Sequence, residues 1–370
     1  MDGVLMHILF DLRTIERLPV AHQIDLMSMW DRVLPTLEAG MQITVFITSD
    51  AKLPRLEHPA LRYVSSGKNH HRKASREELF AVIKRHQPTH YLSPDPRLPP
   101  PREIPSFFLL SEMSHLFADV KKGLFKRWRR FRVIHHHLSI VTGVICPSRA
   151  LFVRLVATFG WSFRHKGHVV HHGIHPAFRT HTVNEITLER RAFLIPRSYA
   201  ILLGNNLETL KTPLYALGRS EDVSAITCVI VGPSHLNNDL RETIREAHLE
   251  GLVRFIDDDL LTMQQLSTLY SGAVVTFEPS LNADYRPSIL QSMASGTPVI
   301  CAASDDNDEL YGNSMLVVHP TDITEWLKAF EMITLSSLLR ERLTTRGFEC
   351  VAEKGWGKTW RAIYDVLRQA

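Results

Sequence analysis

The sequence predicts an α/β protein built from two doubly wound, Rossmann-like domains. Its 370 residues are enough for two domains, at roughly 100 to 200 residues each. Short apolar runs alternate with longer amphipathic stretches, which is typical of βαβ units in parallel sheets covered by helices. This alternation pauses over residues 176–197, a polar, turn-containing stretch, and then restarts. We therefore expect two successive sheets, with an interdomain crevice at the carboxyl ends of their strands as the ligand site.

The first half of the chain contains apolar runs short enough to be buried strands, at residues 5–10, 43–48, 89–94, 106–110, 142–148 and 168–173. Amphipathic segments between them predict helices over residues 24–37, 76–86 and 148–159. Apolar runs of this length with turn residues on either side favour strands over helices. We place the N-terminal domain at residues 1–178.

The second half repeats the pattern, with expected strands at residues 199–204, 226–233, 252–257, 273–279, 298–304 and 315–320. Residues 179–197 are expected to form a linker, and residues 198–355 the C-terminal domain. The last segment, residues 356–370, predicts one amphipathic helix.

Composition excludes several classes of protein. With 44% hydrophobic and 22% charged residues, the chain has a globular composition, without disordered bulk. The four cysteines stand far apart without a CxxC spacing, which argues against a disulfide framework or a zinc knuckle and favours the cytoplasm. No apolar run approaches the roughly 18 residues of a spanning helix. Neither GxGxxG nor a Walker A motif is present, so a classical dinucleotide domain or P-loop is not supported.

Histidines and basic residues raise two further hypotheses. The 20 histidines include a run at 135–137, but no carboxylate stands at a ligand-like spacing, so no metal is expected. Residues 121–132 mix basic residues with Leu124, Phe125 and Trp128, which suits an anionic membrane surface. A solvated helix face explains this segment equally well. Nucleic acid is not expected as a partner, because the net charge is only +4 and no recognition motif accompanies it.

Several segments, taken in order, resemble the GT-B glycosyltransferases of the GT4 type (glycosyl transferases group 1). They are MHILFDLRTI, SPDPRLPPPREIP, VICPSRA, HVVHHGIHPAF, VIVGP, SLNADYRPSILQSMASGTPVICA and ELYGNSMLVVHPTD. The resemblance implies a retaining, hexosyltransferase-like enzyme that takes a nucleotide-sugar donor and needs neither a metal nor another cofactor. It also implies that residues 1–178 form the acceptor side, for a saccharide or lipid-linked acceptor, and that residues 198–355 bind the nucleotide sugar. The implied role is surface polysaccharide or lipopolysaccharide synthesis. The implied location is the cytoplasm, or a peripheral position on the inner face of the plasma membrane.

The chain departs from the family pattern where the donor is held. The two family glutamates, eight positions apart, correspond here to Ala283 and Gln291. Gln291 keeps hydrogen-bonding capacity through its amide, whereas Ala283 offers no polar group. The family's Arg-Lys pair, which neutralises the donor diphosphate, corresponds to Leu210 and Lys211. The resemblance therefore implies that Lys211 is the cation that remains.

The family glycines near the diphosphate correspond to Asp284 and Arg286. A guanidinium at Arg286 suits phosphate and is expected to replace the missing backbone amides. In the N-terminal half, Glu112 stands where the family has a His-Asp pair, with His115 as a possible substitute for the missing imidazole. We therefore predict Lys211, Arg286 and Glu112 as catalytic residues.

The residues predicted to bind the donor lie around the crevice of the C-terminal domain and are Gly204, Asn205, Lys211, Ser288, Gln291 and Glu309. For some of these residues, a role that does not involve the ligand is the alternative. Lys211 can be a solvated surface lysine, and Glu309 a first-turn glutamate that the helix dipole stabilises. Glu278, at the end of an expected strand, either replaces the carboxylate missing at Ala283 or reaches solvent.

Two functions of different classes follow. The first is a glycosyltransferase acting on a saccharide or lipid-linked acceptor. The second is a catalytically inactive GT-B pseudoenzyme that serves as a scaffold or partner of an active transferase, which the missing glutamates favour. The sequence leaves the donor base, the sugar, the acceptor and the oligomeric state open.

Overall fold

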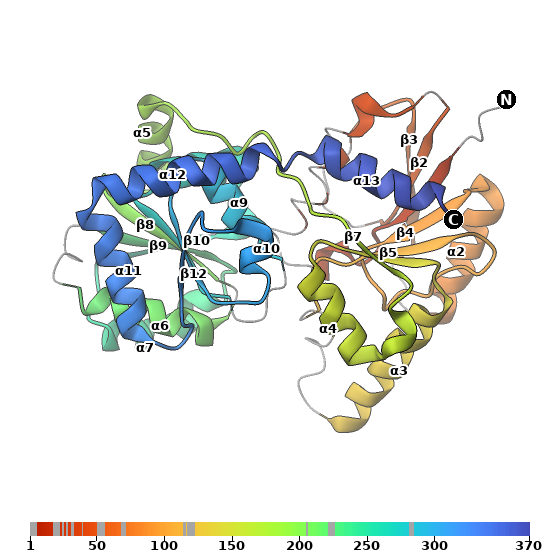
Figure 1. Cartoon of the computed structure of the whole chain (residues 1–370), viewed down its shortest axis with the longest axis horizontal. Helices are drawn as coiled ribbons and strands as arrows, with labels where there is room; N and C mark the ends of the chain where they lie inside the picture. Colours follow the sequence, from red (N-terminus) through yellow and green to blue (C-terminus); the bar gives the residue numbers. More distant parts are fainter. Residues whose placement is uncertain are drawn as a thin grey trace. The chain divides into compact units, whose positions relative to one another are not determined.

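The computed structural model describes residues 6–17, 23, 26, 29–30, 33–38, 40–49, 56–67, 72–113, 116, 123–204, 206–220, 226–280 and 285–370. Contacts divide the chain into two compact units (Figure 1). Unit 1 comprises Met1–Gly173 together with Trp356–Ala370, and unit 2 comprises Ile174–Gly355. The division falls after Gly173, close to the expected end of the first domain at residue 178, and the C-terminal helix belongs to unit 1.

Unit 1 contains a parallel sheet in the order β3-β2-β1-β4-β5-β6-β7. Its strands are β1 His7–Asp11, β2 Gln42–Thr48, β3 Leu61–Ser66, β4 His90–Ser93, β5 Ser106–Leu109, β6 Gly143–Cys146 and β7 Gly167–Val169. Its helices are α2 Arg72–His86, α3 Leu124–Ile140, α4 Arg149–Phe159 and α13 Trp356–Arg368, with short 3-10 turns at η1 Ile15–Arg17, η2 Leu34–Thr36 and η4 Trp161–Phe163. Strand order reverses between β1 and β4, which makes that pair the topological switch point.

Each apolar run expected in the first half overlaps a strand. Most of these strands are buried on both faces, whereas the edge strand β7 is half-exposed. Ile8 and Phe10 of β1 and Ile43 and Val45 of β2 are all almost fully buried. The sequence reading missed β3, whose half-exposed edge position leaves no continuous apolar run to detect. The helix expected over residues 24–37 lies largely outside the described residues.

The C-terminal helix α13 forms where its periodicity predicts. Trp356, Trp360, Ile363 and Leu367 recur every three or four residues and pack into the same core as β1 and β2. The indole of Trp360 lies 5.9 Å from that of Trp30, measured between ring centroids. The last helix of the chain thereby completes the core of the first unit.

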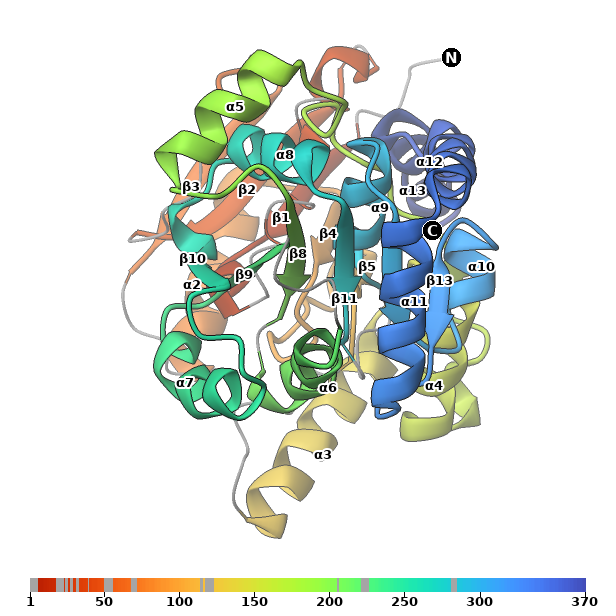
Figure 2. The same ribbon diagram turned by 90° about the vertical axis from the view of Figure 1, so that its left-hand side faces the viewer.

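Unit 2 contains a parallel sheet in the order β10-β9-β8-β11-β12-β13. Its strands are β8 Tyr199–Leu203, β9 Thr227–Gly232, β10 Val253–Asp257, β11 Val275–Glu278, β12 Val299–Ala302 and β13 Leu316–Val318. Its helices are α5 Val183–Ala192, α6 Leu207–Gly218, α7 Leu236–Glu246, α8 Met263–Gly272, α9 Pro287–Ala294, α10 Asn307–Tyr311, α11 Ile323–Leu335 and α12 Ser337–Ala352, with the 3-10 turn η6 Asp258–Leu260. The switch point is β8/β11, which run side by side in Figure 2. Both sheets confirm the predicted pair of doubly wound domains.

The segment 179–197, expected to be a linker, contains helix α5. Thr182 begins this helix with a capping box: Glu185 N donates to Thr182 Oγ1, and Thr182 N donates to Glu185 Oε2 at 2.7 Å. The preceding residues are bonded to α8, since the main-chain N of His181 donates to Ser271 Oγ at 2.8 Å. A Thr-x-x-Glu signature marks this helix start in the sequence.

Among the helices of the described residues, none is both long enough and apolar enough to span a lipid bilayer.

Candidate functional site

Most of the predicted donor-binding residues lie on the segments that follow β8, β11 and β12 in unit 2. Gly204 follows β8 directly, and a Cβ at this position would lie 2.5 Å from the side chain of Leu210. A Cβ on Gly232, which ends β9, would lie 2.2 Å from the carbonyl oxygen of Gly204. Both positions need glycine because the backbones approach closely. Asn205 lies outside the described residues, and Asn206 caps α6 by accepting a hydrogen bond from Glu208 N at 3.0 Å.

Lys211 lies on α6, where its ammonium forms an ion pair of 2.8 Å with Glu208. This hydrogen bond is the main cause that raises the pKa of Lys211. Leu210, which replaces the other member of the family pair, is fully buried in the core of unit 2. Contact between Lys211 and a diphosphate therefore requires the lysine to exchange Glu208 for the ligand.

Glu278 ends β11 and is almost completely buried, with 4% of its surface exposed. Its carboxylate accepts hydrogen bonds from the hydroxyls of Ser288 and Ser280 and, at 3.3 Å, from the main-chain N of Ser280. The predicted donor-binding residue Ser288 thus ties the first turn of α9 to the end of β11. Glu278 does not reach solvent, and its carboxyl group lies at the carboxyl end of β11.

Arg286 immediately precedes α9, and its guanidinium is buried. Nη1 donates to the carbonyl of Ala302 at 3.0 Å, and Nη2 donates to Ser304 Oγ at 3.0 Å and to Asn307 Oδ1. All three acceptors are neutral, and no carboxylate of the described residues forms an ion pair with this arginine. Arg286 therefore brings a positive charge to the carboxyl edge and holds it there by hydrogen bonds to β12 and α10.

Gln291 lies in the middle of α9 and is 2% exposed. Its side-chain oxygen Oε1 has no hydrogen-bond partner among the described residues. A buried amide oxygen without a partner costs about 1 to 3 kcal/mol, so such a group commonly serves a ligand or a water molecule. Ala283 and Asp284, which precede this helix, lie outside the described residues.

Glu309 is exposed on α10, in the first turn of that short helix. Its helix also carries Asn307, which accepts from Arg286. The position of Glu309 fits the dipole-stabilised alternative as well as the ligand-binding one. Gly204, Lys211, Arg286, Ser288, Gln291 and Glu309 all belong to unit 2.

Glu112 belongs to unit 1, where it follows β5 and is buried, with 5% of its surface exposed. His115, its possible companion, lies outside the described residues. Glu112 is the one predicted catalytic residue that the fold places at the carboxyl edge of the first sheet.

The sequence reading missed a buried polar network at the β1/β4 switch point of unit 1. Arg13 donates Nη2 to Asp11 Oδ2 at 2.7 Å and Nε to Asp11 Oδ1 at 2.9 Å, and Tyr91 Oη donates to the same carboxylate at 3.0 Å. After β4, the neighbour of β1 in the sheet, Arg97 donates Nε to Asp95 at 2.7 Å. Although burial opposes it, the Arg97 guanidinium lowers the pKa of Asp95. The signal in the sequence is the Asp-x-Arg triplet that follows β1 and recurs after β4.

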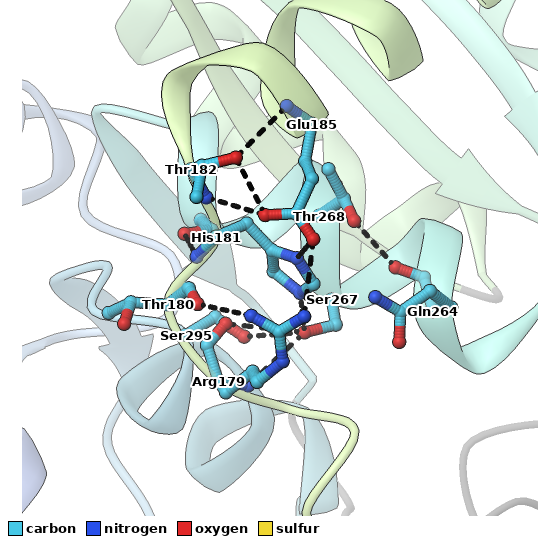
Figure 3. A network of polar contacts seen from close by, with 10 residues as sticks. Arg179, Thr180, His181, Thr182, Glu185, Gln264, Ser267, Thr268 and Ser295 are labelled. Carbon is cyan, nitrogen blue, oxygen red and sulfur yellow. Dashed lines mark hydrogen bonds and ion pairs between the residues drawn. The ribbon is translucent and has the colours of Figure 1, made fainter.

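Ser267, His181 and Glu185 are arranged like a nucleophile, base and acid (Figure 3). His181 Nε2 lies 2.9 Å from Ser267 Oγ, and His181 Nδ1 lies 3.3 Å from Glu185 Oε1. However, Ser267 is completely buried, and its hydroxyl already accepts a hydrogen bond from Arg179 N at 3.2 Å. A nucleophile must be accessible to the substrate. We therefore assign the Ser267–His181–Glu185 group a structural role: it attaches the residues that precede α5 to helix α8.

Part of unit 2 matches a known protein family. The family model "Glycosyl transferases group 1" matches residues 205–334. This range includes α6, the ends of β9 and β11, Arg286, Gln291 and Glu309. The D-inositol 3-phosphate glycosyltransferase of a Nocardioides species is 25% identical over 198 residues, which are 48% of this chain and 43% of that protein. The chain therefore covers less than half the length of this relative.

Solved structures share the fold over the whole chain. Sucrose-phosphate synthase from Thermosynechococcus elongatus superposes with a TM-score of 0.80 at 16% identity, covering 98% of each chain. HepE of Anabaena, solved in complex with UDP-glucose, superposes with a TM-score of 0.75 at 12% identity, covering 99% of this chain and 100% of that one. Residues 205–334 of this chain thus match the group 1 glycosyltransferase model, and its two doubly wound domains share the GT-B fold of these solved structures.

Proposed function

We propose that this protein transfers a sugar from a nucleotide-sugar donor to a saccharide or lipid-linked acceptor, with retention of anomeric configuration. The family match over unit 2 supports the reaction class, because the matched residues include the polar groups at the carboxyl ends of β8, β11 and β12. Ligands of doubly wound domains bind at this edge, next to the switch point. The proposed donor site lies there.

The observation that carries the proposal is the unpartnered side-chain oxygen of Gln291, which is 98% buried beside that edge. Ligand hydroxyls can donate to this oxygen, and the amide nitrogen can donate in return. In the family that the sequence resembles, the residue at this position binds the ribose of the donor nucleotide. A glutamine keeps that hydrogen bond without the charge of the family glutamate.

The leaving diphosphate needs positive charge that is already in place when the bond breaks. Arg286 supplies such a charge, since neutral acceptors hold its guanidinium and no described carboxylate neutralises it. Lys211 supplies a second one if the ligand displaces Glu208 from its ammonium. The proposed mechanism uses these side chains and the N-terminus of α9 in place of a metal.

A membrane-linked acceptor is part of the proposal, because α3 exposes large apolar side chains among its basic residues. Leu124 is 90%, Phe125 70% and Trp128 52% exposed. The rings of Phe125 and Trp128 stack at 5.9 Å. Aromatic side chains flanked by arginines suit the interface of an anionic bilayer, which supports a peripheral cytoplasmic enzyme of surface polysaccharide or lipopolysaccharide synthesis. Lys121 and Lys122 of this basic segment lie outside the described residues.

Calorimetric titration with UDP and with UDP-glucose tests the donor site. The wild-type protein should bind the nucleotide, and Gln291→Leu should weaken that binding. Gln264→Leu, the same change at an exposed position on α8, serves as the matched control. Equal affinity of wild type and Gln291→Leu would remove Gln291 from the donor site.

The second candidate is an inactive scaffold for an active transferase. Two observations favour it: position 283 is an alanine, which has no carboxylate, and Lys211 is already paired with Glu208. A scaffold should show no turnover of any donor and should co-purify with a transferase. Turnover by the isolated wild-type chain would exclude it.

A further inference from the structure

A basic pocket of 570 Å³ lies within unit 1, apart from the donor site of unit 2. Its volume falls within the roughly 300 to 1,000 Å³ of typical small-molecule sites. It is formed by α2, the segment after β4, and α3. None of the described residues that line it is acidic, and the charged or titratable ones are Arg76, Arg97, Arg129, Arg132, His136 and His137.

One wall of this basic pocket is fixed. Arg97 has 8% of its side chain exposed and is bound to Asp95 through Nε, at 2.7 Å and 3.0 Å from the two carboxylate oxygens. His137 is 9% exposed, and its Nδ1 lies 2.8 Å from the carbonyl of Pro96. Because Asp95 and Pro96 follow β4, this wall adjoins the carboxyl edge of the sheet at the β1/β4 switch point. A preformed wall at this edge is typical of a ligand site.

Three other arginines that line the pocket form no ion pair within the described part of the chain. Arg132 lies over the Trp128 ring at 5.1 Å, and Arg76 lies over the Phe80 ring at 5.5 Å. Neither these arginines nor Arg129 forms an ion pair with any described residue. Cation–π contacts orient the guanidinium groups while leaving their N–H donors available for an anion.

We propose that the basic pocket binds the phosphate group of a phosphomonoester or diphosphate ligand. Guanidinium groups recognise phosphate through paired N–H donors, and several of them converge here around one cavity. The anion site itself does not depend on the reaction catalysed. Its assignment to the acceptor rests on the proposed function, and it makes that acceptor a phosphorylated one.

The test uses inorganic pyrophosphate and the full-length protein in calorimetry at low ionic strength. Arg132→Gln should weaken binding about tenfold, as expected for the loss of one charge-assisted contact. Lys126→Gln removes the same charge from an exposed position of α3 that does not line the pocket, and it should change the affinity less than about twofold. Quenching of Trp128 emission, identified by its loss in Trp128→Phe, assigns the bound pyrophosphate to this pocket.

Two binding experiments, one with soluble pyrophosphate and one with lipid vesicles, distinguish a soluble phosphate ligand from a lipid headgroup. Weaker binding of soluble pyrophosphate by Arg132→Gln indicates a soluble ligand. A loss confined to vesicles that contain phosphatidic acid, measured against phosphatidylserine vesicles with the same fraction of anionic lipid, places the phosphate on a lipid headgroup. Equal behaviour of wild type and Arg132→Gln with both pyrophosphate and vesicles, or an equal loss of pyrophosphate affinity in Lys126→Gln, would overturn the proposal. UDP binding is the separate readout of the donor site, so its absence would contradict the proposed function without affecting the anion site.

Discussion

Arg286 and Ala302 are joined by a hydrogen bond of 3.0 Å, which the guanidinium donates to the main-chain carbonyl at the end of β12. The main-chain N of Arg286 donates to Tyr311 Oη at 3.1 Å, and this hydroxyl donates back to the carbonyl of Arg286 at 3.0 Å. One residue therefore links the start of α9 to β12 and α10. Arg286 is a structural element as well as a source of charge.

The first prediction concerns this dual role. Arg286→Ala should lower the free energy of unfolding by about 2 kcal/mol or more, because it removes charge-assisted hydrogen bonds and leaves buried acceptors unpaired. It should also weaken nucleotide-sugar binding more than binding of the bare nucleoside. Denaturant unfolding and calorimetry measure the two effects. Unchanged stability would contradict the structural role, and equal losses for nucleoside and nucleotide sugar would contradict the diphosphate contact.

Gln291 should behave in the opposite way. Gln291→Leu removes a buried oxygen that has no partner, so stability should stay level or rise, while nucleotide affinity falls about two- to tenfold for the loss of a neutral hydrogen bond. Thermal unfolding and calorimetry on the same samples measure both quantities. A destabilised Gln291→Leu variant would show that the amide serves the fold.

Membrane binding should depend on the exposed aromatic pair of α3. Phe125→Ser combined with Trp128→Ser should reduce binding to anionic vesicles about tenfold or more, because each buried aromatic side chain contributes about 1.5 to 3 kcal/mol. Trp161→Ser is the matched control, since Trp161 is 72% exposed on η4 of the same unit. Co-sedimentation at low and high salt measures the effect, and equal losses in the control would argue against α3 as the contact.

The start of α5 should respond to acid. Hydrogen bonds from Thr182, first through its main-chain N–H and then through its hydroxyl, lower the pKa of Glu185 from 4.5 to about 2, with further contributions from His181 and Arg179. A carboxylate with a lowered pKa stabilises the folded state above pH 4.5, and this stabilisation is lost between pH 4.5 and about pH 2. Glu185→Gln should therefore lower the Tm at pH 7, and the difference from wild type should vanish near pH 2. A difference that is independent of pH would contradict this account.

The sequence predicted the parts of the fold that rest on continuous burial. Apolar runs such as residues 226–233 became strands, and the spacing of Trp356, Trp360 and Ile363 identified α13. Strand β3 was missed because an edge strand lacks such a run. Helix α5 was missed because it buries no residue completely and begins with a polar capping box.

The site was harder to predict, because side-chain partners depend on contacts between distant segments. The resemblance located Gln291 and Arg286, but only the structure shows that the former lacks a partner and that the latter is bonded to Ala302 and Asn307. In each of the ion pairs Asp11–Arg13 and Asp95–Arg97 the two residues are two positions apart, so the Asp-x-Arg triplets can be recognised in the sequence. Their meeting at one switch point depends on the order of the strands in the sheet.

Binding of nucleotide sugars to the wild-type chain tests the central claim most directly. A thermal-shift series with UDP-, GDP-, CMP- and dTDP-sugars, followed by turnover of the donor that binds, measures it. A ligand that binds only the folded state raises the Tm as its concentration rises, so at least one donor should do so and be consumed, with a smaller shift in Gln291→Leu. Absence of any shift or turnover, in a protein that co-purifies with an active transferase, would contradict the account and support the scaffold.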